Sequence, residues 1–174
     1  MLRVMTPVAA LACLAALVSP SSAAQASAVR ASHPGRVTAA DYTQTGTLHG
    51  AVDITAADCT PWSINPGLTG SMFWNVTIRT SVLSCRGTAS GTHNEVKHVF
   101  ADGTAFRVWH FNRSASSYDR TCDRCDIGNL GATGNVTAPT THYQVDKLGT
   151  RDTSWYTVEL GDTVSAGTII GYLP

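Results

Sequence analysis

Short apolar runs separated by polar turns dominate the chain after its first thirty residues. Each run has the length of a β-strand, is rich in β-branched or aromatic residues, and is bounded by Gly, Asn, Asp or Pro. No segment keeps a helical apolar stripe over three turns. The pattern therefore predicts a mainly β domain of antiparallel strands. The expected strands lie at 73–78, 95–100, 105–111, 141–145, 155–160 and 168–173.

The first residues carry a different pattern, an apolar run that follows a positive charge. Arg3 precedes the run at 8–18, and small residues suited to cleavage lie at 24–28. This arrangement is typical of a secretory signal peptide, and the run is shorter than the ~20 residues that span a bilayer. We expect three parts: a signal peptide at 1–28, a flexible leader at 29–44, and a single domain at 45–174. The mature protein is then secreted and has no membrane segment.

Composition and charge narrow the classes of partner. The chain has 12 Lys and Arg residues and 12 Asp and Glu residues, so its formal net charge is zero. Such a chain has no basic field with which to bind nucleic acid. Abundant Thr, Ser, Ala and Gly with few charges suit a β-rich extracellular protein. We expect a monomer that binds no nucleic acid.

Four cysteines remain once the signal peptide, which contains Cys13, is removed. An even number in an exported chain indicates two disulfides. Of the 3 possible pairings, we favour Cys59 with Cys85 and Cys122 with Cys125. Half of a zinc knuckle, or a redox motif, is the alternative at 122–125. The sequence offers no second close cysteine pair that would complete a four-thiolate site.

A histidine and a carboxylate four positions apart form the first candidate site. Residues 49–54 read HGAVDI, so His49 and Asp53 are both possible zinc ligands. In a straight strand their side chains would stand ~13 Å apart, so joint binding requires a bend. Gly50 is the residue best able to supply it. Taken alone, the pair is equally compatible with an ordinary hydrogen bond.

Three segments together resemble the lysostaphin-like, or LytM-type, zinc metalloendopeptidases, which cut peptide bonds in bacterial peptidoglycan. Residues 49–54 are similar to the family pattern His-x-Gly-x-Asp-Ile, with the glycine one position early. Residues 131–145 read GATGNVTAPTTHYQV and resemble Gly-x-Thr-Gly-x-Ser-Thr-Gly-Pro-His-Leu-His-Phe-Glu-Val without a gap. Between them, residues 102–112 are similar to a strand that ends in Tyr-x-His-Leu. The resemblance covers about residues 45–145.

The resemblance implies an open, barrel-like β groove with Zn²⁺ at its floor. His49, Asp53 and His142 would be the metal ligands, and His110 would be a catalytic histidine beside them. One position departs from the pattern: Thr140 stands where the family has the first histidine of His-x-His. A threonine hydroxyl neither accepts a proton near neutral pH nor carries positive charge. Zinc binding is therefore expected to survive this difference better than catalysis.

Two functions from different classes follow. The first is a zinc-dependent peptidoglycan hydrolase acting on cell-wall peptides, and the second is a catalytically impaired zinc-binding domain with a binding or regulatory role. His110 and the complete ligand set favour the enzyme, whereas Thr140 favours the second function. His93 and His98 lie on or beside the expected strand at 95–100 and are interpreted as ordinary surface or core histidines.

Overall fold

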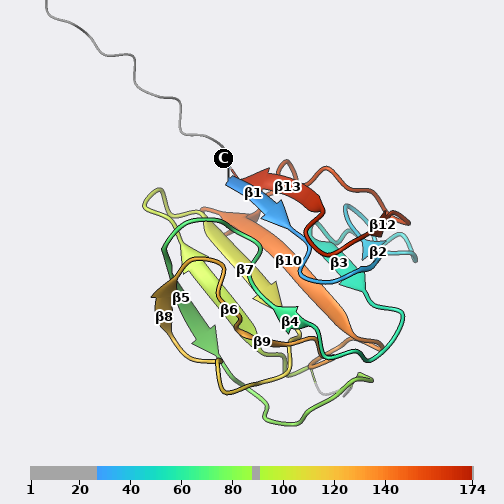
Figure 1. Ribbon diagram of the computed structural model, residues 1–174. Coiled ribbons are helices and arrows are strands. Elements are labelled where there is room, and N and C mark those ends of the chain that lie inside the picture. Colours follow the sequence, from blue (N-terminus) through green and yellow to red (C-terminus); the bar gives the residue numbers. More distant parts are fainter. Residues whose placement is uncertain (1–26, 88–90, 174) are drawn as a thin grey trace, which may run out of the picture.

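The computed structural model describes residues 27–87 and 91–173, which form β-strands, turns and loops (Figure 1). The predicted mainly β, antiparallel class is confirmed, since every strand pair in the described part is antiparallel. No helix long and apolar enough to span a membrane occurs in these residues. The strands are β1 Ser27–Arg30, β2 Gly35–Ala39, β3 Val52–Thr55, β4 Ser63–Ile64, β5 Met72–Thr77, β6 Glu95–Val99, β7 Ala105–Trp109, β8 Arg120–Cys122, β9 Gly128–Asn129, β10 Thr140–Lys147, β11 Thr150–Arg151, β12 Thr163–Val164 and β13 Ile169–Leu173.

One large sheet organises the molecule. Its strands follow the order β12-β2-β3-β10-β7-β6-β5-β8, and β11 pairs with β10 outside this path. The eight-residue strand β10 lies at the centre, between β3 and β7. In this register His142 stands opposite Asp53 on one side and opposite Trp109 on the other. Segments far apart in the sequence therefore meet at β10.

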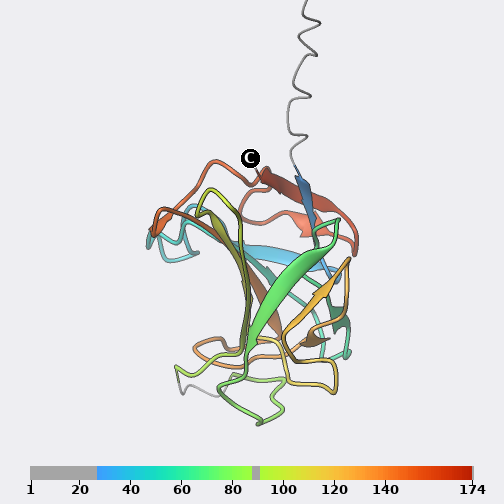
Figure 2. The same ribbon diagram turned by 90° about the vertical axis from the view of Figure 1, so that its left-hand side faces the viewer.

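The two faces of this sheet differ in chemistry because side chains alternate along each strand. On one face, Ile54, Val108 and Tyr143 are fully buried in the hydrophobic core. The small sheet of β1 and β13 adds Val29 and Ile170 to the same core. Figure 2, which looks along the large sheet, places β1 and β13 to one side of β6 and β7. The opposite face, which we call the site face, carries Asp53, His142, Gln144, Trp109 and Arg107.

The segment expected as a flexible leader contains two strands instead. The prediction for 29–44 is wrong over β1 and β2: β1 pairs with β13, and β2 pairs with both β3 and β12. Val29 and Val37 are fully buried. The Ala-, Ser- and Thr-rich composition does not predict these strands, because β1 and β2 each contribute few large apolar side chains to the core. The expected signal peptide falls almost entirely on residues 1–26, which lie outside the described residues.

The remaining strand predictions hold except near the end of the chain. The strand expected at 155–160 is absent, and only an isolated bridge between Tyr156 and Gly171 occurs there. Farther along, β12 pairs with β2 at the edge of the large sheet, while β13 pairs with β1. The C-terminal segment thus completes the fold by pairing with the N-terminal strands that the sequence did not predict.

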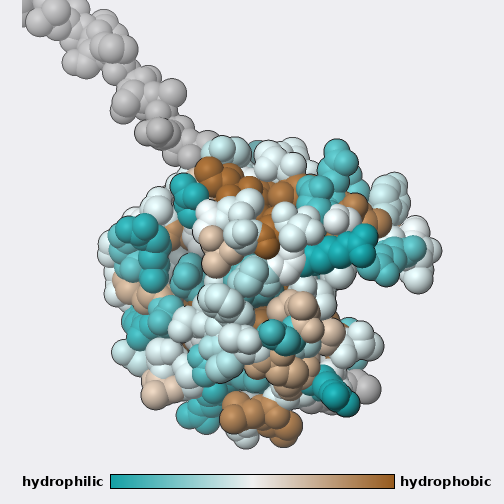
Figure 3. All heavy atoms as spheres, turned by 45° about the vertical axis from the view of Figure 1, so that its right-hand side comes forward, coloured by the Kyte–Doolittle hydropathy of each residue, from teal (hydrophilic) through white to brown (hydrophobic). Residues whose placement is uncertain are grey.

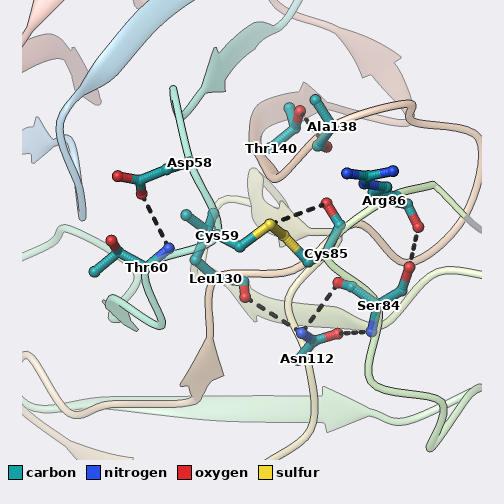
Figure 4. Close-up of a disulfide and its surroundings, with 10 residues drawn as sticks. All are labelled: Asp58, Cys59, Thr60, Ser84, Cys85, Arg86, Asn112, Leu130, Ala138 and Thr140. Carbon is teal, nitrogen blue, oxygen red and sulfur yellow. Dashed lines mark hydrogen bonds between the residues drawn. A yellow bond between two sulfur atoms is a disulfide. The ribbon is translucent and has the colours of Figure 1, made fainter.

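The cysteines pair as the sequence favoured. Cys59 is bonded to Cys85, with Cα atoms 5.6 Å apart, and Cys122 is bonded to Cys125. Figure 4 shows that the first disulfide lies beside Asn112, whose side chain bonds both the amide and the carbonyl of Ser84. Asn112 also donates to the Leu130 carbonyl. Covalent and polar links therefore fix the loops that flank β7 and β9.

Candidate metal centre

Three side chains on the site face could hold a metal ion. The possible ligand atoms of His49, Asp53 and His142 all lie within 4.8 Å of one another. Asp53 and His142 are direct cross-strand neighbours on β3 and β10. His49 reaches them from the loop before β3, where Gly50 adopts a φ of +66° that disfavours a residue with a Cβ. The bend that the sequence required is therefore present at Gly50.

Asp53 lies between the two imidazoles. Its Oδ1 is 2.6 Å from Nδ1 of His142, and its Oδ2 is 3.2 Å from Nε2 of His49. Burial alone would raise the pKa of Asp53, but the hydrogen bond to His142 and the attraction of both imidazoles outweigh it. The pKa of this carboxyl therefore lies below its usual value, and Asp53 is an anion at neutral pH.

The donor atoms fit a zinc ion. Although Nε2 of His49 is near Asp53, it is buried and has no well-aligned hydrogen-bond partner among the described residues. A buried polar atom without a partner is costly and is uncommon in folded proteins. Two imidazoles and one carboxylate are a common ligand set of catalytic zinc, which keeps a further position open. A metal ion would provide the partner that this nitrogen lacks.

A line of hydrogen bonds on the site face orients His142. Its Nε2 is 3.1 Å from Oε1 of Gln144, whose amide nitrogen donates to Asp146 at 2.6 Å. Arg107 then donates to both Asp146 and Glu95. Because the Asp146 carboxylate can only accept, the amide of Gln144 must point its oxygen at His142. If a metal replaces the hydrogen bond between Nδ1 of His142 and Asp53, the remaining proton of His142 lies on Nε2, where Gln144 accepts it.

His110 lies next to this cluster because the backbone departs from strand geometry. Its φ is +75°, which is uncommon for a residue with a Cβ, and it directly follows Trp109 at the end of β7. Its ring centroid is 5.8 Å from that of His142. Nδ1 of His110 donates to the Thr133 carbonyl at 2.7 Å, so Nε2 carries the lone pair. Burial is the main cause that lowers the pKa of His110 to about 4, so the ring is neutral at pH 7.

A fourth histidine, His93, lies in the same group, whereas the sequence analysis interprets it as an ordinary surface or core histidine. Its ring stacks on Trp109 at a centroid distance of 4.5 Å and stands 5.7 Å from that of His110. Trp109 in turn stacks on His142 at 4.3 Å. The one available signal is alternation, since His93 lies two positions before Glu95, which pairs with Trp109. His98 is confirmed as a structural histidine, because it bonds the Phe73 carbonyl and packs on Trp74, which belongs to the core.

Thr140 occupies the position where the resemblance expects a histidine. Its hydroxyl lies 3.0 Å from that of Thr55 and donates to the Ala138 carbonyl at 2.9 Å. Thr140 and Asp53 both line a cavity of about 350 Å³. This position therefore faces open space beside the cluster, but its side chain supplies only a hydroxyl that is already bonded.

The solved structures that are similar to this chain include the following two. One is a mutant catalytic domain of the prophage-encoded M23 protein EnpA from Enterococcus faecalis, with 20% identity and a TM-score of 0.43 over 77% of this chain and 92% of that one. The other is a zinc-containing peptidase from Vibrio cholerae, with 18% identity and a TM-score of 0.43 over 77% of this chain and 37% of that one. No protein-family model and no curated protein matches the chain.

Proposed function

We propose that this protein is a secreted zinc metalloendopeptidase that hydrolyses peptide bonds in bacterial peptidoglycan. The observation that carries the proposal is the convergence of His49, Asp53 and His142 within 4.8 Å. Imidazole nitrogen and carboxylate oxygen suit zinc better than they suit Mg²⁺ or Ca²⁺, which prefer oxygen alone. The peptidoglycan substrate is inferred from the motif resemblance at 49–54 and 131–145. The apolar run at 8–18 and the two disulfides support export.

Each residue of the site would have a separate task. When bound, zinc supplies a Lewis acid that polarises a carbonyl and lowers the pKa of water. The single negative charge of Asp53 leaves the site with net positive charge, which favours that chemistry. His110 presents the lone pair of Nε2 and takes the proton of the attacking water as general base. The Thr133 carbonyl holds His110 in this tautomer.

Space for a peptide exists beside the cluster. The cavity that includes Asp53 and Thr140 shares Thr38, Gln44 and Thr55 with a larger cavity of about 630 Å³. Figure 3 shows the surface hollowed on the side of β2 and β12. Threonine hydroxyls and small residues make up much of both linings. An uncharged, extended peptide could lie along these cavities with a bond next to the cluster.

A catalytically impaired zinc-binding domain is the second candidate, because Thr140 supplies no acid-base group. One experiment separates the two. The mature chain is loaded with zinc and incubated with purified peptidoglycan, then treated with a chelator and resupplied with zinc. Release of new amino groups that stops with the chelator and returns with zinc supports the peptidase. Stoichiometric zinc without any release supports the binding domain, and failure to bind zinc rejects both.

A further inference from the structure

Peptide hydrolysis needs a second proton carrier that Thr140 cannot provide. As water adds to the carbonyl carbon, one proton must leave the water, and as the C–N bond breaks, one proton must reach the amine nitrogen. His110 is the base of the proposed function. The hydroxyl of Thr140 is committed to Thr55 and Ala138 and carries no proton to spare at neutral pH.

The six histidines of the chain all lie in its described part, and their positions limit the choice. His49 and His142 belong to the metal cluster. His33 is fully buried and bonds the hydroxyl of Thr141, whose strand position faces the core. His98 packs on the core residue Trp74. Besides His110, only His93 is left to serve the site.

His93 lies in the same group of aromatic rings as His110 and His142. Its ring stacks on Trp109, which stacks on His142, and meets the ring of His110 edge-on. It is only partly buried, whereas His110 is 7% exposed. Contact with solvent allows the ring of His93 to regain a proton after each turnover.

The motif glycine Gly134 makes room for both rings. A Cβ added there would lie 2.9 Å from Cβ of His93 and 3.4 Å from Nδ1 of His110. The φ of Gly134 is +90°, a conformation that other residues rarely adopt. The backbone between the rings is also fixed, because the His110 amide donates to the Asn94 carbonyl and the Asn94 amide donates to the Thr133 hydroxyl. His93 and His110 are therefore packed as one unit.

We propose that His93 is a catalytic residue that gives the leaving amine its proton, in the role that a histidine at position 140 would otherwise fill. This rests on the proposed function. Water loses one proton to His110 as the C–O bond forms, and His93 transfers one proton to the amine nitrogen as the C–N bond breaks. The products are a carboxylic acid and an amine. Afterwards, His93 regains its proton from solvent and His110 returns one.

Five variants of the full chain test this role. In His93→Gln, and in His93→Phe, which keeps a ring to stack on Trp109, kcat should fall about 10²- to 10⁴-fold. KM and zinc affinity should stay within about threefold, because His93 is not a ligand. The matched control His98→Gln, at a histidine of β6 whose strand position faces the core, should keep near wild-type kcat. Thermal unfolding of each variant checks that it folds.

The decisive variant is the double change His93→Gln with Thr140→His. A new imidazole beside the cavity should recover at least about tenfold of the lost kcat, while Thr140→His alone should gain much less. Equal kcat for wild type and both His93 variants would overturn the proposal. A loss in His93→Gln that His93→Phe repairs would also overturn it, because the ring would then act only by packing. If the zinc-loaded wild type cuts nothing, the proposed function itself fails, and the role of His93 fails with it.

Discussion

Replacement of Gln144 by Leu should weaken zinc binding while the sheet stays folded. Gln144 is 5% exposed, and its oxygen is the acceptor for Nε2 of His142. A leucine has similar volume but no acceptor, so the proton on Nε2 would be buried without a partner. The imidazole could then move its proton to Nδ1, the nitrogen that faces Asp53 and would bind the metal.

The expected size of the effect follows from this one hydrogen bond. Loss of a group that orients a metal-binding histidine typically costs 10- to 100-fold in metal affinity, or about 1.4 to 2.8 kcal/mol. Arg107 keeps its bonds to Asp146 and Glu95 in the variant, so the rest of the line is retained. The loss should therefore stay within this range.

Competition with a chromophoric chelator at fixed pH measures the zinc Kd directly and requires no activity. Gln44→Leu is a matched control, because Gln44 is exposed and does not belong to the candidate ligand set. Its zinc Kd should equal that of the wild type. A zinc Kd for Gln144→Leu within about twofold of wild type, in a folded protein, would refute the tautomer argument.

Three further outcomes are expected elsewhere in the chain. Tyr143→Phe removes the hydroxyl that accepts from the Ser32 amide, so denaturant unfolding should show a loss of about 1–3 kcal/mol; an unchanged midpoint would contradict this. Burial lowers the pKa of His33 below its unfolded value, so the contribution of His33 to stability is complete above about pH 6.5 and is lost as the pH falls. His33→Gln should therefore flatten the fall in Tm below about pH 6.5. An equally steep fall in the variant would contradict this role of His33. Gly134→Ala should displace His93 and lower kcat. Gly149→Ala is the control, because Gly149 has open space around it, and it should leave kcat unchanged. Equal kcat values for the two variants would argue against close packing at Gly134.

The class of fold could be predicted from the sequence because most strands of the large sheet carry regular apolar patterns. The strands β5, β6, β7, β10 and β13 all fall on expected runs. In contrast, β1 and β2 are short and contain mostly small residues, and their burial depends on distant partners. A pairing between the two ends of a chain leaves no local pattern, so the leader was misinterpreted.

Some residues of the candidate site could be predicted from the sequence, and others could not. The family resemblance suggests His49, Asp53, His142 and His110, because each lies in a segment whose residue order resembles that family. His93 could not be found in that way, because its place depends on the stacking of Trp109 between the rings of His93 and His142. The role of Gln144 likewise requires the cross-strand register, which fixes its neighbours Asp146 and Arg107.

The central claim is that His49, Asp53 and His142 together bind one zinc ion. Equilibrium dialysis of the purified mature chain against buffered zinc, followed by elemental analysis, tests it most directly. The account predicts one zinc per chain for wild type and for His98→Ala, and a sharp loss for His49→Ala, Asp53→Ala and His142→Ala. A wild type that retains no zinc, or alanine variants that retain as much as the wild type while folded, would contradict it.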